Sequence, residues 1–219
     1  MPLNPSRSES KFFERSRIAL TNAESHSEIK AALIEYGVDE TFIAEGWQVF
    51  NRAKETWERN KLEVSETKLA SNAYHNAYTE LEMKFKRHRD LSLILCRKDP
   101  DMQILLGVKG RFPVAYNKFF DNVKLYYTSI ITIPEVQTKM AVIKITPEVA
   151  TSQLTELDHL LTLRADYDKE KGESQDTTVS KNAALHELSE WMDNFDILAE
   201  IALYDNPQRL EVLGLLVRS

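Results

Sequence analysis

A spacing of alternately four and three residues runs along residues 39–98, and most of the recurring positions toward its two ends are apolar. This stretch contains no proline, and its one glycine, Gly46, lies near its start. A 4–3 spacing places the recurring residues on one face of a helix that packs along other helices. The sequence therefore predicts one long helix, whose packed face is apolar toward both ends and polar in the middle. The positions on this face are Gly46, Phe50, Ala53, Trp57, Asn60, Val64, Thr67, Ser71, Tyr74, Tyr78, Leu81, Phe85, His88, Ser92 and Leu95.

The chain matches itself without a gap when Lys11 is placed on Lys118 and the same shift is applied to every residue. We call this the repeat shift, and two residues that it superimposes occupy matching positions. The clearest matches are Lys11, Phe12 and Phe13 with Lys118, Phe119 and Phe120, and Leu106 and Gly107 with Leu213 and Gly214. A fixed period of this kind is typical of a chain built from repeated structural units. We interpret it as a duplication, with repeats at residues 5–111 and 112–218 that pack as one structural unit.

Each repeat is expected to contain four helices in the same order. The first covers residues 8–22 and 113–128 or slightly beyond, the second 27–36 and 134–143, and the third is the long helix and its counterpart. The fourth helix begins at Pro100 and at Pro207. Pro113 is expected in the first turn of its helix, where the missing N–H is not needed.

Short polar residues and glycines predict where these helices begin and end. Residues with side-chain oxygens can accept hydrogen bonds from the free N–H groups of a first turn, and glycine can adopt the left-handed conformation that ends a helix. The expected N-caps are Asp39 and Thr146 for the long helices, Asp99 and Asn206 for the fourth, and His26 or Ser27 for the second. The fourth helices are expected to end near Gly107 and Gly214.

The centre of each long helix allows two interpretations. Gly172 could end one helix and begin a hairpin, or it could let two long helices approach closely. The matching stretch, residues 60–71, contains neither glycine nor proline. Because homologous repeats share their backbone, unbroken helices are favoured, and hairpins at 60–71 and 166–178 are the alternative.

Charge favours side-by-side pairing of the two long helices. Residues 40–98 contain 11 basic and 9 acidic residues, whereas residues 147–205 contain 4 and 14. Helices of opposite net charge repel each other less when they lie together. The predicted fold is all-α: an elongated helical bundle of two homologous units around a pseudo-twofold axis. Its two long helices are antiparallel, and short helices cluster at both ends.

Two sequence elements occur in both repeats. One is a long helix that ends in Pro-x5-Leu-Gly-x3-Arg, and the other is a Gly-Glu-Ser-Gln-Asp-x-Thr-like helix middle, clear only at residues 172–178. Together with the terminal segment 202–214, they resemble a family of uncharacterised bacterial all-helical proteins with tandem helical units. The resemblance covers nearly the whole chain and implies an architecture without any activity, cofactor or site residue. The first repeat departs from the pattern, with Ser65 at the glycine position.

Composition limits the classes of partner. The formal net charge of −6, from 28 basic and 34 acidic side chains, argues against general binding to nucleic acid or an anionic membrane. No apolar run approaches the ~20 residues of a membrane span. The first ten residues lack the pattern of a secretory signal, so a cytoplasmic location is expected. Cys96, the single cysteine, stands among apolar residues and is expected to be a small core residue.

Glu156 and His159 form a Glu-x-x-His pair. Carboxylate-bridged metal sites in helical bundles use two such pairs and two further glutamates. The repeat shift places Val49 and Arg52 at the matching positions, so the pair is not duplicated. We therefore expect no metal site here.

Other candidate groups have structural interpretations. His88 lies on the packed face and is expected to be a satisfied core or boundary histidine; His186 and Glu187 are expected to be an ordinary polar pair on a helix surface. The basic residues Lys84, Lys86, Arg87, Arg89, Arg97 and Lys98 could meet phosphate, but the acidic second long helix is the favoured partner. The aromatic residues Phe112, Tyr116, Phe119, Phe120, Tyr126 and Tyr127 are expected to pack in the core, with a ligand pocket as the alternative.

The sequence contains no glycine-rich phosphate loop, nucleophile elbow or Cys/His cluster. We therefore predict no catalytic, cofactor-binding or metal-binding residue. The favoured function is a non-catalytic interaction or scaffold protein of the cytoplasm, which binds an unknown protein partner or itself. A small-ligand- or metal-binding helical bundle is the alternative.

Overall fold

A computed structural model describes residues 5–215, with side chains from residue 9 onward, and all of its regular secondary structure is helical. Residues 1–4 and 216–219, which include the end of the predicted second repeat, lie outside the described residues. The all-α prediction is confirmed. The helices are α1 (Pro5–Ser25), α2 (Ser27–Glu35), α3 (Glu40–Leu95), α4 (Pro100–Leu105), α5 (Tyr116–Thr132), α6 (Pro134–Ala141), α7 (Pro147–Ala202) and α8 (Gln208–Val212).

The two long helices are unbroken, as favoured from the sequence. Each has 56 residues, and the first and last residues of α7 match those of α3 under the repeat shift. Gly172 lies inside α7, so the hairpin alternative is wrong. A Cβ atom at Gly172 would meet nothing within 4 Å, so this glycine does not serve a close approach of helices either.

The chain forms two compact units, which we describe separately. Unit 1 comprises residues 1–64 and 173–219, and unit 2 comprises residues 65–172. The predicted repeats divide the chain elsewhere, between residues 111 and 112. Each compact unit therefore contains part of the first predicted repeat and part of the second.

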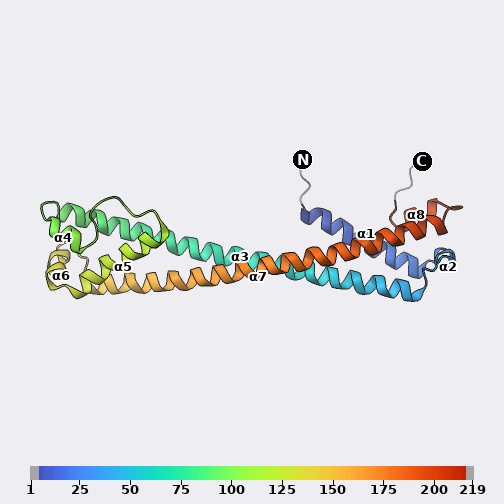
Figure 1. The fold of residues 1–219 in the computed structure, drawn as a ribbon, viewed down its shortest axis with the longest axis horizontal. Coiled ribbons are helices and arrows are strands. Elements are labelled where there is room, and N and C mark those ends of the chain that lie inside the picture. Colours follow the sequence, from blue (N-terminus) through green and yellow to red (C-terminus); the bar gives the residue numbers. More distant parts are fainter. Residues whose placement is uncertain (1–4, 216–219) are drawn as a thin grey trace. The chain divides into compact units, whose positions relative to one another are not determined.

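In unit 1, α1 and α2 lie beside the first part of α3, and the last part of α7 packs with them (Figure 1). Asn60 Nδ2 lies 2.9 Å from Thr178 Oγ1, and Arg52 pairs with Glu187 at 3.2 Å. Rising numbers on α3 thus meet falling numbers on α7, so these segments are antiparallel. The core residues include Phe13, Leu20, Leu33, Phe50, Leu188, Met192 and Phe195.

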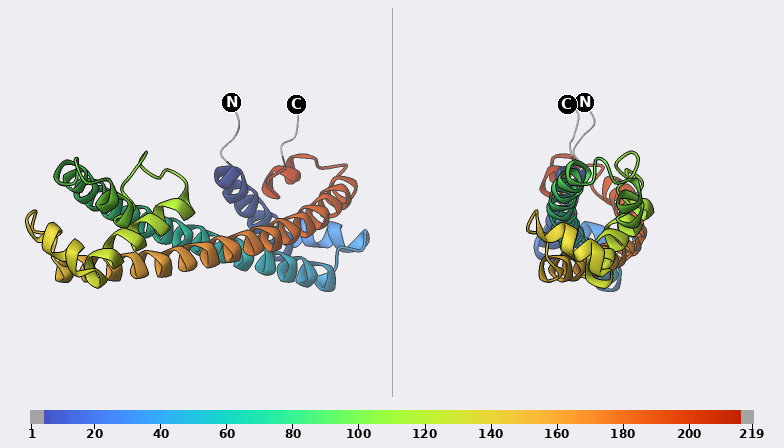
Figure 2. Two further views of the ribbon diagram at one scale, coloured as in Figure 1. Left: turned by 60° about the vertical axis from the view of Figure 1, so that its left-hand side comes forward. Right: turned by 90° about the vertical axis from the view of Figure 1, so that its left-hand side faces the viewer.

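In unit 2, α5 and α6 accompany the last part of α3 and the first part of α7 (Figure 2). Thr67 Oγ1 donates to the Glu170 carbonyl at 3.1 Å, and Lys84 pairs with Glu156 at 2.7 Å, so these segments are antiparallel as well. The core is rich in aromatic rings. Its largest residues include Phe85, Phe119, Phe120, Tyr126 and Tyr127.

Most helix starts follow the predicted capping. The side chains of Asp39, Thr146 and Asp99 accept hydrogen bonds from backbone N–H groups of the first turns, at 3.0, 3.4 and 3.1 Å. Both α4 and α8 are followed by a glycine with positive φ, 63° at Gly107 and 77° at Gly214, as expected for a left-handed C-cap.

Several helix ends differ from the prediction. α5 begins at Tyr116, so Pro113 precedes the helix and does not occupy its first turn. Pro207, and not Asn206, is the N-cap of α8. His26 is the N-cap of α2, one of the two residues expected there, but its side chain forms no capping hydrogen bond. In each case local propensity indicated the right region, and the packing of the flanking segments decided the exact boundary.

Gly46 allows a close approach of helices inside unit 1. A Cβ atom at this position would lie 2.3 Å from Trp191 Cζ2 and 2.8 Å from Leu20 Cδ2. The glycine lets the Trp191 indole of α7 and the Leu20 side chain of α1 rest directly on the α3 backbone. A side chain here would displace both.

Candidate functional site

The most concentrated set of polar groups in a core lies in unit 2, between α3 and α5. His88 and Ser92 are one turn apart on α3, and Tyr126 and Tyr127 are adjacent on α5. Three of the four are fully buried, at 0 % exposure for Ser92, Tyr126 and Tyr127. A polar group in such surroundings needs a hydrogen-bond partner.

Each hydroxyl group of this cluster has a partner. Tyr126 Oη lies 2.7 Å from Ser92 Oγ, and Tyr127 Oη lies 2.9 Å from His88 Nδ1. Ser92 Oγ also lies 2.9 Å from the His88 carbonyl, one turn earlier on α3, and 3.4 Å from Met140 Sδ on α6. The network thus joins three helices around one turn of α3.

Burial determines the protonation of the cluster. It raises the pKa of Tyr126 and of Tyr127 far above the ordinary tyrosine value. Burial also lowers the pKa of His88, and the nearby cations Arg87 and Lys84 lower it further. At neutral pH the phenols are therefore protonated and the imidazole is neutral. With both phenols and Ser92 out of contact with solvent, these groups act as structural hydrogen-bond partners.

The matching positions of unit 1 are all apolar. The repeat shift replaces His88 and Ser92 by Phe195 and Ala199, and Tyr126 and Tyr127 by Ala19 and Leu20. All four apolar residues are buried at 0 % exposure. One unit therefore fills this region with a hydrogen-bonded network, and the other fills it with hydrocarbon.

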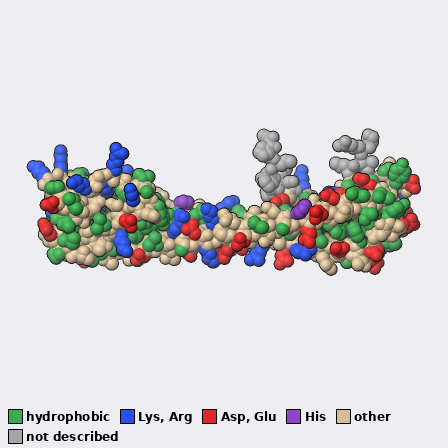
Figure 3. Space-filling model, viewed as in Figure 1, with side chains coloured by type: hydrophobic (Ala, Val, Ile, Leu, Met, Phe, Trp, Pro, Cys, Tyr) green, Lys and Arg blue, Asp and Glu red, His purple; other side chains and the backbone are tan. Residues whose placement is uncertain are grey.

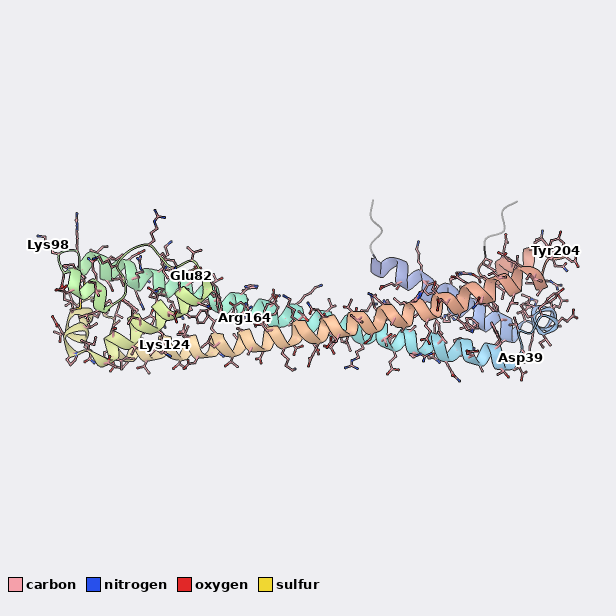
Figure 4. All side chains as sticks on the ribbon, viewed as in Figure 1. Asp39, Glu82, Lys98, Lys124, Arg164 and Tyr204 are labelled. Atoms are coloured by element: carbon pink, nitrogen blue, oxygen red, sulfur yellow. The ribbon has the colours of Figure 1, made fainter. Side chains whose placement is uncertain are left out.

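A second constellation surrounds Arg164 on α7 in unit 2 (Figure 4). Its guanidinium carbon lies 5.3 Å from the ring centroid of Tyr74 and 5.4 Å from that of Tyr116, and Asp168 accepts from Nε at 2.7 Å. A guanidinium over aromatic faces is held by cation–π attraction. The side-chain hydrogen bonds to Asp168 and Tyr74 raise the pKa of Arg164.

Unit 1 also has a set of interacting aromatic and charged side chains at the matching positions, but the aromatic and charged residues stand at different positions of the set. Trp57 corresponds to Arg164, Glu9 to Tyr116, Lys181 to Tyr74 and Lys61 to Asp168. Glu9 accepts from Trp57 Nε1 at 2.9 Å and from Lys181 Nζ at 2.6 Å, and Lys61 Nζ lies 3.3 Å from the Trp57 ring centroid. All four positions differ between the units, yet both sets remain mutually attractive.

The Glu156 and His159 pair has no geometry of a metal site. Glu156 accepts from Lys84 at 2.7 Å and from Gln153 at 3.0 Å, while His159 is exposed. The carboxylate is therefore engaged in an ion pair with α3. Arg52, which occupies the position of unit 1 that matches His159, pairs with Glu187 of α7.

The basic stretch of α3 divides into three environments. Lys84 reaches Glu156 of α7, as predicted. Arg89, in contrast, is buried at 6 % exposure and donates to the carbonyls of Val108 and Gly110, at 2.9 and 2.5 Å, so its expected pairing with the acidic helix is wrong. Lys86 and Arg87 are exposed. A sequence pattern alone gives no sign that a loop will wrap around one arginine of such a stretch.

The remaining candidates mostly follow the predictions. Cys96 is buried at 0 % exposure, and burial raises the pKa of its thiol. The aromatic residues at the start of the second repeat are in the core of unit 2, with Tyr116 at its edge. His186 does not pair with Glu187: its Nε2 lies 3.4 Å from Glu190, because residues four apart share a helix face.

No protein-family model, curated protein or solved structure matches the chain. None of the described helices unites the length and the apolar character that a membrane crossing requires.

Proposed function

We propose that this chain is a non-catalytic interaction or scaffold protein, built on a duplicated helical bundle and acting in the cytoplasm. The observation that carries the proposal is that the two units have matching interiors and different surfaces. An interior that recurs while the surface differs suits a protein whose two units contact different partners.

The matching interiors support the duplication. Many residues at matching positions are buried in both units, within α1 and α5, α2 and α6, and α3 and α7 and directly after the long and the last short helices, and the polar constellations around Arg164 and Trp57 occupy matching positions as well. The buried pairs are Phe13 and Phe120, Ala23 and Ile130, Ile29 and Val136, Leu33 and Met140, Phe50 and Leu157, Ala53 and Leu160, Leu81 and Leu188, Phe85 and Met192, Cys96 and Leu203, and Leu106 and Leu213. A single ancestral unit, followed by duplication, explains this agreement.

The surfaces of the units differ in charge. Unit 1 carries 12 basic and 20 acidic residues, a net charge of −8, and unit 2 carries 16 and 14, a net charge of +2. Acidic side chains are frequent on the face of unit 1 that Figure 3 shows. Surface charge of opposite sign selects different partners and speeds their association.

The polar groups of the cores favour a structural role over catalysis. The network of His88, Ser92, Tyr126 and Tyr127 is closed, Glu156 and Arg89 are engaged by other groups of the chain, and Cys96 is buried. An acid–base or nucleophilic catalyst has to reach a substrate. The exposed surface is therefore the part of the molecule through which we expect it to bind partners.

Photo-cross-linking in living cells that make the protein tests the proposal. A photoreactive residue would replace Val179 in unit 1 or Val142 in unit 2, which are 70 % and 71 % exposed. We expect discrete protein adducts whose identity differs between the two positions. Absence of adducts at both positions, together with a stoichiometric small molecule retained in native mass spectrometry, would contradict a scaffold.

A hollow in unit 1 favours small-ligand binding as the second candidate. It has a volume of about 420 Å³ between α1, α2 and the start of α3, and its lining includes Ala23, Glu24, Lys30 and Trp47. The matching residues of unit 2, Ile130, Ile131, Gln137 and Leu154, carry no charge. A ligand that co-purifies with the wild type and is lost on Ala44→Phe, which fills the hollow from its exposed wall, would establish this function.

A further inference from the structure

An exposed strip of apolar and basic residues runs along α3 in unit 2. Its members share one helix face and line a shallow hollow of about 390 Å³. Met83 is 60 % exposed, Ile94 74 % and Leu91 36 %. The α3 strip consists of Met83, Lys86, Arg87, Asp90, Leu91 and Ile94, so it carries two basic residues and one acidic residue. Among the described residues, neither Lys86 nor Arg87 forms an ion pair, so both charges face solvent.

The matching surface of α7 in unit 1 is also exposed and apolar, with the opposite charge. Ile197 and Ile201 are 57 % and 49 % exposed, and Tyr204, in the turn after the helix, is 83 % exposed. Glu190 and Asp193 occupy the positions that match Met83 and Lys86. The α7 strip consists of Glu190, Asp193, Ile197, Ile201 and Tyr204.

We propose that the α3 strip of one copy binds the α7 strip of a second copy of this chain. The inference rests on the proposed scaffold function and names one partner for it. Two exposed apolar strips of matched length and opposite charge are complementary to each other. In a pair of α7 strips the carboxylates of Glu190 and Asp193 would meet like charges, and in a pair of α3 strips the net positive charges would repel each other.

Charge also selects the relative direction of the two helices. In a parallel, in-register pair, Lys86 meets Asp193, Arg87 lies beside Glu190, and Ile94 meets Ile201. In an antiparallel pair, Ile94 would meet Glu190, and the two basic residues would cover isoleucines. The parallel arrangement gives both basic residues an acidic neighbour and brings Ile94 to Ile201, and it places Asp90 opposite Ile197.

The two kinds of strip allow two modes of assembly. Two copies that use both strips on each other close as a dimer, whereas copies that use them on different neighbours add head to tail. In both modes the average mass grows with concentration. Two short strips make a small interface, so we expect weak binding, with dissociation constants of roughly 10–100 µM.

Sedimentation of the full-length protein tests the inference through charge reversal. Lys86→Glu with Arg87→Glu (variant A) makes both strips of the chain acidic, and Glu190→Lys with Asp193→Lys (variant B) makes both basic. Each variant alone should therefore self-associate at least ~10-fold more weakly than the wild type. Their equimolar mixture should associate again, because every strip of A is then complementary to a strip of B.

A further pair of changes limits the mixture to a single contact. Ile201→Glu added to variant A, and Ile94→Glu added to variant B, disable the strip of each chain whose charge was not reversed. The mixture should then form a one-to-one dimer and nothing larger. The exposed reversal Lys118→Glu with Lys124→Glu on α5 is the matched control and should leave association of the otherwise unchanged chain as it is. Circular dichroism should show equal helix content in all variants.

A wild type that stays monomeric up to ~1 mM would overturn the inference, and so would self-association that survives the charge reversal of variant A. In either case, photo-cross-linked adducts with other proteins would still support the scaffold function. Sedimentation therefore tests the self-association, and photo-cross-linking tests the scaffold function independently of it.

Discussion

Lys181 Nζ lies 2.6 Å from Glu9 Oε1, although the two residues are far apart along the chain. Their side chains are only 13 % and 19 % exposed, and Trp57 donates to the same carboxylate. Glu9 belongs to α1 in the first predicted repeat, and Lys181 to α7 in the second. This ion pair therefore joins the two halves of the sequence inside one compact unit.

Loss of the Lys181 charge should destabilise unit 1. Lys181→Met leaves the partly buried Glu9 with one partner fewer, and we expect a loss of roughly 1–3 kcal/mol in the free energy of unfolding. Lys54→Met removes an exposed pair with Glu58, which lies at 3.9 Å, and should cost less than ~0.5 kcal/mol. Denaturant unfolding of both variants measures the difference. Equal costs would show that the Glu9 pair contributes no more than a surface pair.

Leu81 and Leu188 should be equally important. They occupy matching positions and are 1 % and 0 % exposed, in units 2 and 1 respectively. Truncation of either to alanine leaves a cavity and should cost about 2–5 kcal/mol. Leu69→Ala and Leu62→Ala, at exposed leucines of units 2 and 1, are the controls and should cost little. A severe effect at Leu81 with a neutral one at Leu188 would argue against equivalence of the two positions.

His88 and Tyr127 should be energetically coupled. His88→Phe introduces the residue of the matching position in unit 1, but it leaves the buried Tyr127 hydroxyl without its partner, at a cost of roughly 1–3 kcal/mol. Tyr127→Phe in the same chain removes that hydroxyl as well. A double-mutant cycle should therefore show the pair costing less than the sum of the single changes. Strict additivity would mean that the 2.9 Å hydrogen bond contributes nothing to stability.

Stability should fall in alkaline solution. Burial raises the pKa of Tyr126 and Tyr127 in the folded chain, whereas the unfolded chain releases these protons near the ordinary tyrosine pKa of about 10. Above that pH the unfolded state binds fewer protons, so the free energy of unfolding decreases as pH rises. Tyr126→Phe should reduce this slope, and Tyr204→Phe, at an exposed tyrosine, should not. Chemical denaturation from mildly to strongly alkaline pH makes the comparison, and identical slopes in the wild type and both variants would show that the buried Tyr126 does not cause the loss of stability.

The hydrophobic periodicity of the sequence predicts those features of the fold that depend on residues close together in the chain. The packed face from Gly46 to Leu95, the caps Asp39 and Thr146 and the glycines after α4 and α8 depend on local backbone geometry, and all were predictable. The duplication remains a prediction, supported by the matching interiors. Helix ends such as those near Pro113 and Asn206 were misplaced because packing of the adjacent loops, and not local propensity, decides them.

The sequence pattern did not predict contacts between segments that lie far apart along the chain. The bonds of Arg89 to two loop carbonyls and of Glu9 to Lys181 need knowledge of which helices lie together. A signal for the second contact does exist in hindsight. The repeat shift turns Glu9, Trp57, Lys61 and Lys181 into Tyr116, Arg164, Asp168 and Tyr74, so all four positions change as a set. A compensated change of that kind indicates that the four side chains are close in space, but it can be recognised only after the two repeats have been aligned.

Each compact unit is assembled from both halves of the sequence. This assembly can be examined by inserting a protease site after Val114, which is 88 % exposed between α4 and α5, and cleaving the folded protein there. We expect fragments 1–114 and 115–219 to stay together in native size-exclusion chromatography with unchanged helix content, and to separate only in denaturant. If the fragments separate under native conditions and each retains its helical structure, the units are not built from both halves.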